Sequence, residues 1–194
     1  MKLAIVKYNA GNVQSLTFAL NRLGVDPILT NDPEELFSAD KVIFPGQGEA
    51  SSAMRSLRSN GLDKVLADLK QPFLGVCLGM QLMCSRTEEN DTECLGIIPM
   101  EVKRFIPNNI KVPHMGWNDI TRLNSPILKG VKEGSYIYFV HSYYVPVCEY
   151  TTAECTYDVT FSAMLQKDNF HAIQAHPEKS AEPGMTILEN FIKL

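Results

Sequence analysis

Cys77 stands in the segment G-V-C-L-G-M-Q at 75–81, where an apolar run passes directly into a helical pattern. A nucleophile on a sharp turn between a strand and a helix stands clear of the sheet edge, and small neighbours let a substrate approach it. At a helix N-terminus the macrodipole and free N–H groups favour the thiolate, which is the reactive form of cysteine. The segment predicts a reactive thiol, with a buried structural cysteine as the alternative.

A proton shuttle for this thiol is available in A-H-P-E-K-S at 175–180, directly after the apolar run F-H-A-I-Q-A. Catalytic groups gather beyond the carboxyl ends of parallel strands, so His176 and Cys77 could meet there. Glu178 can fold back to one imidazole nitrogen while the other faces the thiol. Cys77, His176 and Glu178 are then a complete triad by role. The alternative is a histidine in a solvent-exposed turn.

A third strand-end segment, F-P-G-Q-G at 44–48, carries two glycines around Gln47. Gly46 and Gly48 permit a backbone with exposed N–H groups, as an oxyanion hole requires. An ordinary turn is the alternative interpretation.

The remaining cysteines and histidines show no catalytic or metal-ligand spacing, and we predict neither a metal site nor a cofactor. The other four cysteines are expected to be structural, and the other three histidines structural or binding: Cys84, Cys94, Cys148, Cys155, His114, His141 and His171.

The elements expected around these segments alternate in the first half of the chain and become β-rich in the second. Apolar periodicity predicts strands at 3–8, 25–29, 42–44 and 73–76, and helices at 13–23, 33–37, 53–69 (with 60–61 as a candidate break) and 78–84. After residue 100 it predicts strands at 100–106, 117–123, 136–140, 143–147, 152–157, 161–166 and 170–175, then a helix at 184–193. We therefore expect an α/β fold with a mostly parallel central sheet flanked by helices, additional antiparallel strands in the C-terminal half, and one sheet and one core shared by both halves.

Length and charge narrow the function further. The chain of 194 residues fits one domain spanning 1–194. A net charge of -4 gives no basic field for nucleic acid or anionic lipid. We expect a cytoplasmic protein, because no apolar run approaches the length of a signal h-region or a membrane span.

In combination, the segments P-G-Q-G, G-V-C-L-G-M-Q and H-P-E-K-S resemble the class I (triad) glutamine amidotransferase domain, of flavodoxin-like type, over essentially the whole chain. Three further segments are similar to the glutaminase subunits of imidazole glycerol phosphate synthases of histidine biosynthesis: A-G-N at 10–12, K-V-P-H-M-G-W-N at 111–118 and Y-F-V-H-S-Y at 138–143. The resemblance implies hydrolysis of glutamine to glutamate and ammonia, and transfer of the ammonia to a cyclase partner, the synthase barrel, in a heterodimer.

The resemblance also implies roles for individual residues. Cys77 attacks the carboxamide, His176 protonates the leaving ammonia, and Glu178 holds the imidazole. The backbone amides of Gln47 and Leu78 form the oxyanion hole. The implied glutamine pocket contains Gly46, Gly48, Gln81, Glu89, Ser142 and Tyr143, and the implied partner face contains Asn12, Trp117, Tyr138 and Lys179.

Four positions depart from the family pattern: Lys7, Asn9, Gln47 and Ala175 stand where Asp, Gly, Val and Phe are usual. Three other functions remain open. They are the glutaminase of another pathway, such as an anthranilate or aminodeoxychorismate synthase, a cysteine hydrolase on the same type of fold, and a non-catalytic, flavodoxin-like module that holds phosphate.

Overall fold

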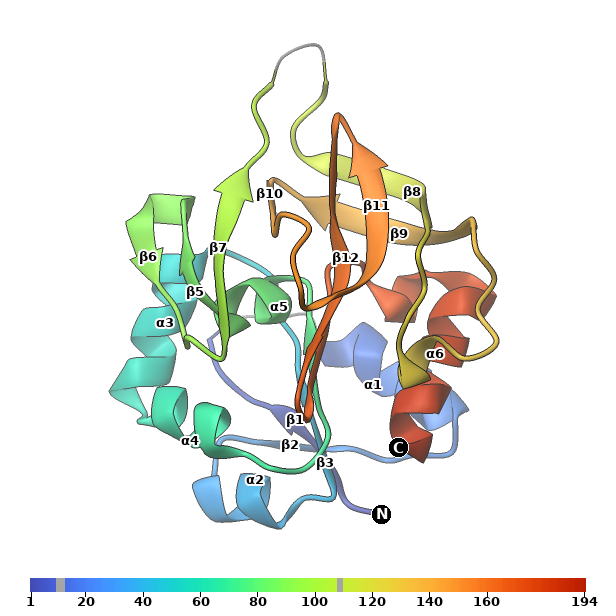
Figure 1. The fold of residues 1–194 in the computed structure, drawn as a ribbon. Helices are drawn as coiled ribbons and strands as arrows, with labels where there is room; N and C mark the ends of the chain where they lie inside the picture. The colour runs from blue at the N-terminus through green and yellow to red at the C-terminus, as the bar shows by residue number, and fades with distance from the viewer. Residues whose placement is uncertain (10–12, 108–109) are drawn as a thin grey trace.

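The computed structural model describes residues 1–9, 13–107 and 110–194. The first half alternates strands and helices as predicted (Figure 1). It runs β1 (Leu3–Val6), α1 (Val13–Arg22), β2 (Ile28–Thr30), α2 (Pro33–Ser38), β3 (Lys41–Phe44), α3 (Ala50–Ser59), α4 (Leu62–Asp68), β4 (Phe73–Val76) and α5 (Leu78–Met83). The expected break in the long helix is confirmed, because Gly61 adopts a φ of 68° between α3 and α4.

The second half is rich in strands and closes with the helix α6. It runs β5 (Cys84–Thr87), η1 (Glu89–Asp91), β6 (Thr92–Glu93), β7 (Ile98–Arg104), β8 (His114–Ile120), η2 (Pro126–Leu128), β9 (Ser135–His141), β10 (Tyr143–Tyr144), β11 (Thr151–Tyr157), β12 (Val159–Lys167), β13 (Phe170–Ile173), η3 (Pro177–Lys179) and α6 (Ala181–Lys193). No helix in the described ranges has the length and apolar content that crossing a bilayer requires.

A seven-stranded sheet in the order β11-β12-β13-β4-β3-β1-β2 forms the centre of the molecule. Five of its strands, β2, β1, β3, β4 and β13, run parallel. Strands β12 and β11 continue it as an antiparallel extension. This confirms the predicted mostly parallel sheet with added antiparallel strands, and it places β3, β4 and β13 side by side.

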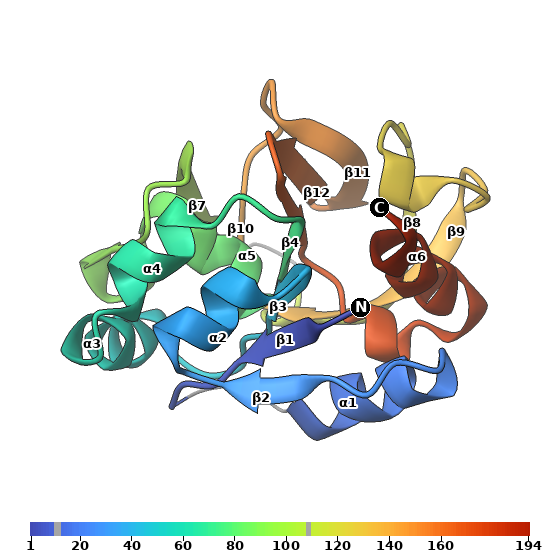
Figure 2. The ribbon, with the colours of Figure 1, turned by 90° about the horizontal axis from the view of Figure 1, so that it is seen from below.

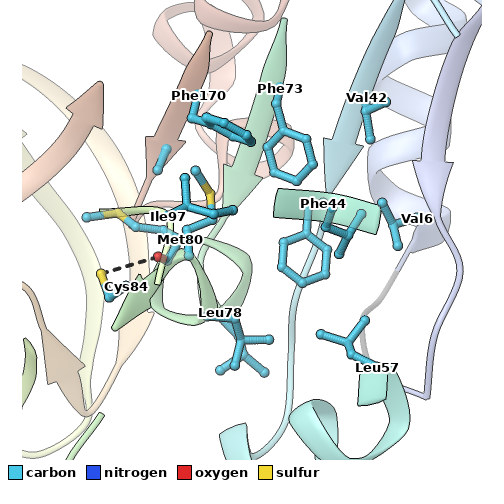
Figure 3. Close-up of a cluster of buried hydrophobic side chains, with 14 of the residues drawn as sticks. Val6, Val42, Phe44, Leu57, Phe73, Leu78, Met80, Cys84, Ile97 and Phe170 are labelled. Atoms are coloured by element: carbon cyan, nitrogen blue, oxygen red, sulfur yellow. Dashed lines mark hydrogen bonds between the residues drawn. The ribbon is translucent and has the colours of Figure 1, made fainter. Parts of the chain in front are cut away.

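Helices cover both faces of the central sheet (Figure 2). On one face, α2 to α5 pack over a cluster that includes Phe44, Leu57 and Phe73 (Figure 3). On the other face, α1 and α6 pack over a second cluster that includes Leu20 and Phe191. Strands buried on both faces read as the continuous apolar runs seen in the sequence.

Two expectations for the second half were wrong. The strands there do not all share one sheet, because β10, β7, β5 and β6 form a four-stranded sheet and β8 pairs with β9 alone. The apolar residues form two clusters, one for each face of the central sheet, and not one core. Strands β5 and β6 were not predicted at all: the helix expected over 78–84 ends at Met83, and Cys84 begins a strand.

Candidate active site

The carboxyl ends of β3, β4 and β13 bring the three predicted segments to one edge of the central sheet. Pairing of β3 with β4 and of β4 with β13 puts Phe44 beside Gly75 and Ile173 beside Val76. Each strand therefore delivers its next residues to the same place. Residues 45–48, Cys77 and the segment 174–178 meet there because their strands are adjacent and parallel.

Cys77 occupies a strained turn between β4 and α5. Its φ of 54° and ψ of -111° lie outside the backbone regions that non-glycine residues favour. Its N–H donates a hydrogen bond to the Ile173 carbonyl at 2.8 Å. Gly79 permits the turn, because a Cβ there would overlap the Phe44 carbonyl oxygen. Gly46 has the same role from the other side, since its Cβ would lie 2.5 Å from the Gly79 nitrogen. The turn and the P-G-Q-G loop therefore pack backbone to backbone.

The P-G-Q-G loop has a further anchor that the sequence did not reveal. The hydroxyl of Tyr8, two residues after the end of β1, donates to the Pro45 carbonyl at 2.7 Å. Burial raises the pKa of Tyr8 above its ordinary range, so its phenol stays a donor. Gly48 adopts a φ of 112°, which favours glycine.

His176 and Glu178 form the predicted pair within a short turn. The Glu178 Oε1 atom lies 2.9 Å from His176 Nδ1, and both side chains are nearly buried. Pro177 begins the 3-10 turn that folds Glu178 back. The Ser180 hydroxyl donates to the His176 carbonyl at 2.6 Å and accepts from the Tyr138 N–H at 2.9 Å. The His176 N–H in turn donates to the Tyr138 carbonyl at 2.9 Å.

The charge state of His176 depends on its two acidic neighbours. Burial lowers its pKa, but its interactions with the Cys77 sulfur and the Glu178 carboxylate outweigh burial and raise the pKa to about 10. The imidazole therefore rests as an imidazolium at neutral pH. An imidazolium beside the Cys77 sulfur is an acid positioned to protonate a leaving group.

Cys77 and His176 open into a cavity of about 410 Å³. This volume is in the range of sites that enclose small ligands. The cavity brings together nearly all the predicted oxyanion and substrate residues. Its lining comprises Gln47, Gly48, Cys77, Leu78, Gln81, Glu89, Pro113, Val140, His141, Ser142, Tyr143, His176 and Lys179.

Two predicted placements differ from this lining. Gly46 does not line this cavity and instead lines a small separate space together with Leu16 and Glu178. Lys179, expected at the partner face, lines the cavity although it is exposed. The Val140 and His141 contribution was not predicted as part of the pocket.

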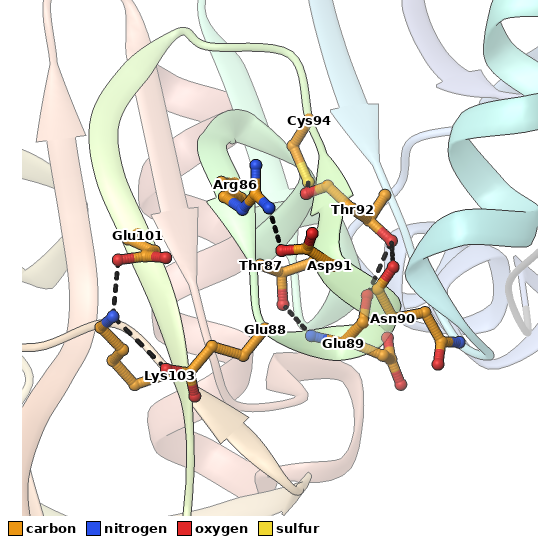
Figure 4. Close-up of polar contacts among 10 residues, drawn as sticks. All are labelled: Arg86, Thr87, Glu88, Glu89, Asn90, Asp91, Thr92, Cys94, Glu101 and Lys103. Carbon is orange, nitrogen blue, oxygen red and sulfur yellow. Dashed lines mark hydrogen bonds and ion pairs between the residues drawn. The ribbon is translucent and has the colours of Figure 1, made fainter.

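Glu89 lines the cavity. It lies in the turn η1, whose polar contacts are drawn in Figure 4. Thr87 accepts from the Glu89 N–H at 3.2 Å, and the Thr92 hydroxyl donates to the Glu89 carbonyl at 2.7 Å. The Glu89 carboxylate accepts a hydrogen bond from the Ala50 N–H at 2.8 Å. Burial, opposed by this hydrogen bond, raises the pKa of Glu89. The carboxylate is suited to hold an ammonium group of a ligand.

Gln174 is a buried polar side chain that sequence reasoning missed. It follows β13 directly and lies 3.8 Å, through Nε2, from the Cys77 sulfur. Its Oε1 accepts from Gln81 Nε2 at 3.0 Å. The available signal was a glutamine at the end of an apolar strand, two residues before the histidine of the triad.

His114 and His141 form a buried pair on β8 and β9. His114 Nδ1 lies 2.9 Å from His141 Nε2, and His141 Nδ1 lies 2.7 Å from the Tyr143 carbonyl. Because only a ring N–H can meet that carbonyl, His141 is protonated on Nδ1 and accepts from His114 on Nε2. Burial lowers the pKa of His114 to about 4 and, together with the charge of neighbouring histidines, the pKa of His141 to about 3.

Two of the predicted partner residues, Trp117 and Tyr138, lie on the same two strands. Trp117 is 51% exposed and its ring packs edge-on against that of Tyr138, its cross-strand partner. Met115 and Tyr136 are also exposed there. Asn12 lies outside the described residues. In the described part of the chain, no three His, Cys, Asp or Glu side chains are grouped to hold a metal ion.

Comparisons with known proteins indicate the family of the chain. A family model described as "Glutamine amidotransferase class-I" matches residues 4–194. The chain is 55% identical over 196 residues to a protein of Bacteroides thetaiotaomicron named "Imidazole glycerol phosphate synthase subunit HisH", with 100% of each chain covered. It is 40% identical over 200 residues to "Imidazole glycerol phosphate synthase subunit HisH 1" of Vibrio vulnificus, covering 100% of this chain and 98% of the other.

Solved structures share the fold at low sequence identity. A crystal structure of a glutamine amidotransferase has a TM-score of 0.75 at 17% identity, with 98% of this chain and 99% of that one covered. PurLQS from Thermotoga maritima has a TM-score of 0.75 at 16% identity, with 99% and 97% covered. At these identities the likeness concerns the fold alone.

Proposed function

Because the chain belongs to the class-I glutamine amidotransferase family, and is similar over its whole length to proteins named imidazole glycerol phosphate synthase subunit HisH, we propose that it is the glutaminase subunit of that synthase. The observation that carries this proposal is the meeting of Cys77 and His176 at one cavity, with Glu178 bonded to the far nitrogen of the imidazole. The function is thus the one that the sequence motifs predicted.

The triad accounts for amide hydrolysis in two stages. The Cys77 thiolate adds to the side-chain carbonyl carbon of glutamine, and the carbonyl electrons move to oxygen. When the oxyanion collapses, the C–N bond breaks and His176 donates its proton to the leaving ammonia. Water, deprotonated by His176, then attacks the thioester, and glutamate leaves as Cys77 regains its thiolate. Glu178 holds the imidazole in the tautomer that both stages need.

The remaining cavity residues are assigned by position and chemistry. The Leu78 N–H belongs to the first turn of α5 and has no intrahelical acceptor, so it can stabilise the oxyanion together with the Gln47 N–H. Glu89 and Gln81 present oxygen atoms for the ammonium of glutamine. Ser142 and Tyr143, with the backbone of Gly48, complete the proposed substrate site, and Gly46 supports it through its close packing against Gly79.

The partner is a second subunit of the synthase, and we assign it as the cyclase barrel that receives the ammonia. The exposed Trp117, packed against the half-buried Tyr138, and Lys179 at the cavity support a partner face close to the site. The P-G-Q-G loop is expected to turn a backbone N–H toward the oxyanion only in the complex. Isolated chains should then hydrolyse glutamine slowly.

Glutamate release by the purified chain, with and without a cyclase partner and its nucleotide ligand, tests this proposal. We expect slow release alone, faster release in the complex, and loss of both in Cys77→Ala. Full activity without any partner would contradict the loop hypothesis. Absence of activity under every condition would contradict the glutaminase function.

A further inference from the structure

Gln174 is a fully buried carboxamide beside the nucleophile, and the chemistry described above does not use it. Its side chain is 0% exposed, although burying an amide is unfavourable unless its hydrogen bonds are satisfied. Its backbone N–H donates to the Ala163 carbonyl at 2.9 Å, which fixes its place at the end of β13. A polar group kept at this position requires an explanation in terms of its partners.

The neighbours of Gln174 determine which way its amide points. Gln81 uses its amide N–H groups for the Tyr143 carbonyl and for Gln174 Oε1, both at 3.0 Å. The oxygen of Gln174 therefore faces Gln81, and its NH₂ group faces the Cys77 sulfur at 3.8 Å. Sulfur is a larger acceptor than oxygen, so its hydrogen bonds are longer. A flipped Gln174 would place two NH₂ groups against each other.

Besides His176, whose imidazole interacts with it, the Cys77 sulfur has a further polar neighbour with the opposite preference to Gln174. The Val140 carbonyl lies 3.7 Å away and can only accept, so it favours a protonated thiol. An N–H donor favours the thiolate, because a hydrogen bond to the charged form stabilises that form. Of these two contacts, the one from Gln174 is the one that favours the reactive state.

We propose that Gln174 is a positioning residue for the nucleophile, whose carboxamide N–H holds the Cys77 sulfur as a thiolate facing the cavity. The proposal deepens the glutaminase function and rests on it for its biological meaning. The hydrogen bond itself acts on the free enzyme, before glutamine binds. Gln81 is then a support for this orientation as well as a substrate residue.

Alkylation of Cys77 by iodoacetamide as a function of pH tests the proposal on the full chain without partner or glutamine. The rate is followed by mass spectrometry of the peptide that contains Cys77. Gln174→Met keeps the length of the side chain but removes the donor. A hydrogen bond to a charged group stabilises that group strongly. We therefore expect alkylation at pH 7 to slow by about 10- to 100-fold in this variant, and the curve of alkylation rate against pH to move to higher pH.

A matched control is available at Asn169, whose amide donates to the Leu69 and Gln71 carbonyls at 3.1 and 2.8 Å. Asn169→Leu removes a structural amide in the same way and should lower stability without moving the alkylation curve. If circular dichroism shows that Gln174→Met does not fold, Gln174→Asn replaces it, since the shorter amide withdraws the N–H from the sulfur. An unchanged curve in the folded variant overturns the proposal. Because alkylation needs no turnover, this result is independent of whether glutamine is the substrate.

Discussion

Two regions build the cavity, and they differ in how they are held. The strand-end region (residues 44–48, 75–81 and 173–180) continues three paired strands of the central sheet and packs between two apolar clusters. The β8–β9 arm (residues 114–141) is a two-stranded sheet that pairs with itself. One region is fixed by the sheet, whereas the other lies against it and presents Trp117 outward.

From this difference we expect the strand-end region to govern hydrolysis and the β8–β9 arm to govern the response to the partner. In the proposed mechanism, the strand-end region carries the thiol, the imidazole, the carboxylate and the backbone amides. The arm adds the Val140 carbonyl, the His114–His141 pair and the backbone of Tyr138, which exchanges hydrogen bonds with His176 and Ser180. Variants in the strand-end region should therefore impair hydrolysis in the isolated chain. Variants in the arm should chiefly change the response to the partner.

Glu178→Gln is the variant with the largest expected effect. It keeps the shape of the triad but removes the carboxylate that supports the imidazolium, and we expect glutamine hydrolysis to fall by about 10²- to 10⁴-fold. Steady-state glutamate release with and without the partner measures it. An equal fractional loss in both conditions would place the effect on chemistry. A loss seen only in the complex would break the distinction between the regions.

The pH profile of the same variant sharpens this prediction. With Glu178 present, the pKa of His176 is about 10, so the proton donor persists until the pH approaches that value. In Glu178→Gln the alkaline fall in activity should move toward neutral pH. The raised pKa of His176 also stabilises the folded state. This stabilisation is complete when the pH is below the ordinary histidine pKa of 6.5, and it is lost as the pH rises toward 10. Urea unfolding at about pH 6 and about pH 10 should show a wild-type advantage only at the lower pH.

Gly79→Ala tests the rigidity of the strand-end region. A methyl group there would overlap the Phe44 carbonyl oxygen, which belongs to a buried strand and cannot move away easily. We expect a loss of about 3 kcal/mol in the free energy of unfolding, together with loss of activity as residues 45–48 shift. Gly61→Ala is the control, because the added methyl group would have no atom within 4 Å. Only the backbone φ of 68° is unfavourable for alanine at this position. It should cost about 1 kcal/mol and leave hydrolysis unchanged.

Ser180→Ala tests the contact between the two regions. The change removes a donor to the His176 carbonyl and an acceptor for the Tyr138 N–H, and should cost about 1–2 kcal/mol of stability. We expect the activation by the partner to fall more than the basal rate. Ser162→Ala is the matched control for Ser180→Ala, because the buried Ser162 hydroxyl also makes two hydrogen bonds, with the Pro146 carbonyl and with the Thr151 hydroxyl. Equal loss of activation in both variants would assign the effect to general destabilisation.

The strand-end region could be predicted from the sequence because each reactive segment directly follows an apolar run, and the carboxyl ends of parallel strands lie at the same edge of a sheet. Apolar runs that end at Pro45, Cys77 and His176 predict strands, and parallel strands bring their ends together without knowledge of any side-chain contact. The family and the glutaminase function predicted from these motifs are confirmed by the comparisons. The roles of the individual site residues stay predictions.

The arm could not be predicted in the same way. Whether β8 and β9 join the central sheet or pair alone depends on long-range packing, and periodicity reports only that each is a strand. Strand β5 was missed because Cys84 continues an apolar helix pattern across the point where the backbone becomes extended. Gln174 was missed because one polar residue in an apolar run has no meaning until its neighbours are known.

The smallest expected effect belongs to His114→Leu, in the arm. His114 donates a hydrogen bond to His141, and His141 donates one to the Tyr143 carbonyl. The same carbonyl accepts a hydrogen bond from Gln81, which in turn supports Gln174. The variant therefore weakens the support of Gln174 only indirectly. We expect alkylation of Cys77 to slow by only about 2- to 5-fold, as for a fraction of one hydrogen bond.

His171→Leu provides the comparison for His114→Leu, because burial lowers the pKa of both histidines to about 4. Each is protonated near pH 6.5 when unfolded but stays neutral when folded, so the native chain loses stability as the pH falls from about 6.5 to about 4. Either variant should reduce this acid sensitivity, measured as unfolding free energy against pH. Only His114→Leu should also slow the alkylation of Cys77, since His171, on β13, packs against Phe191 and lies outside the hydrogen bonds of the arm. If His171→Leu slows it equally, the arm has no specific connection to the nucleophile, and the histidine pair serves only to fill the space between β8 and the central sheet.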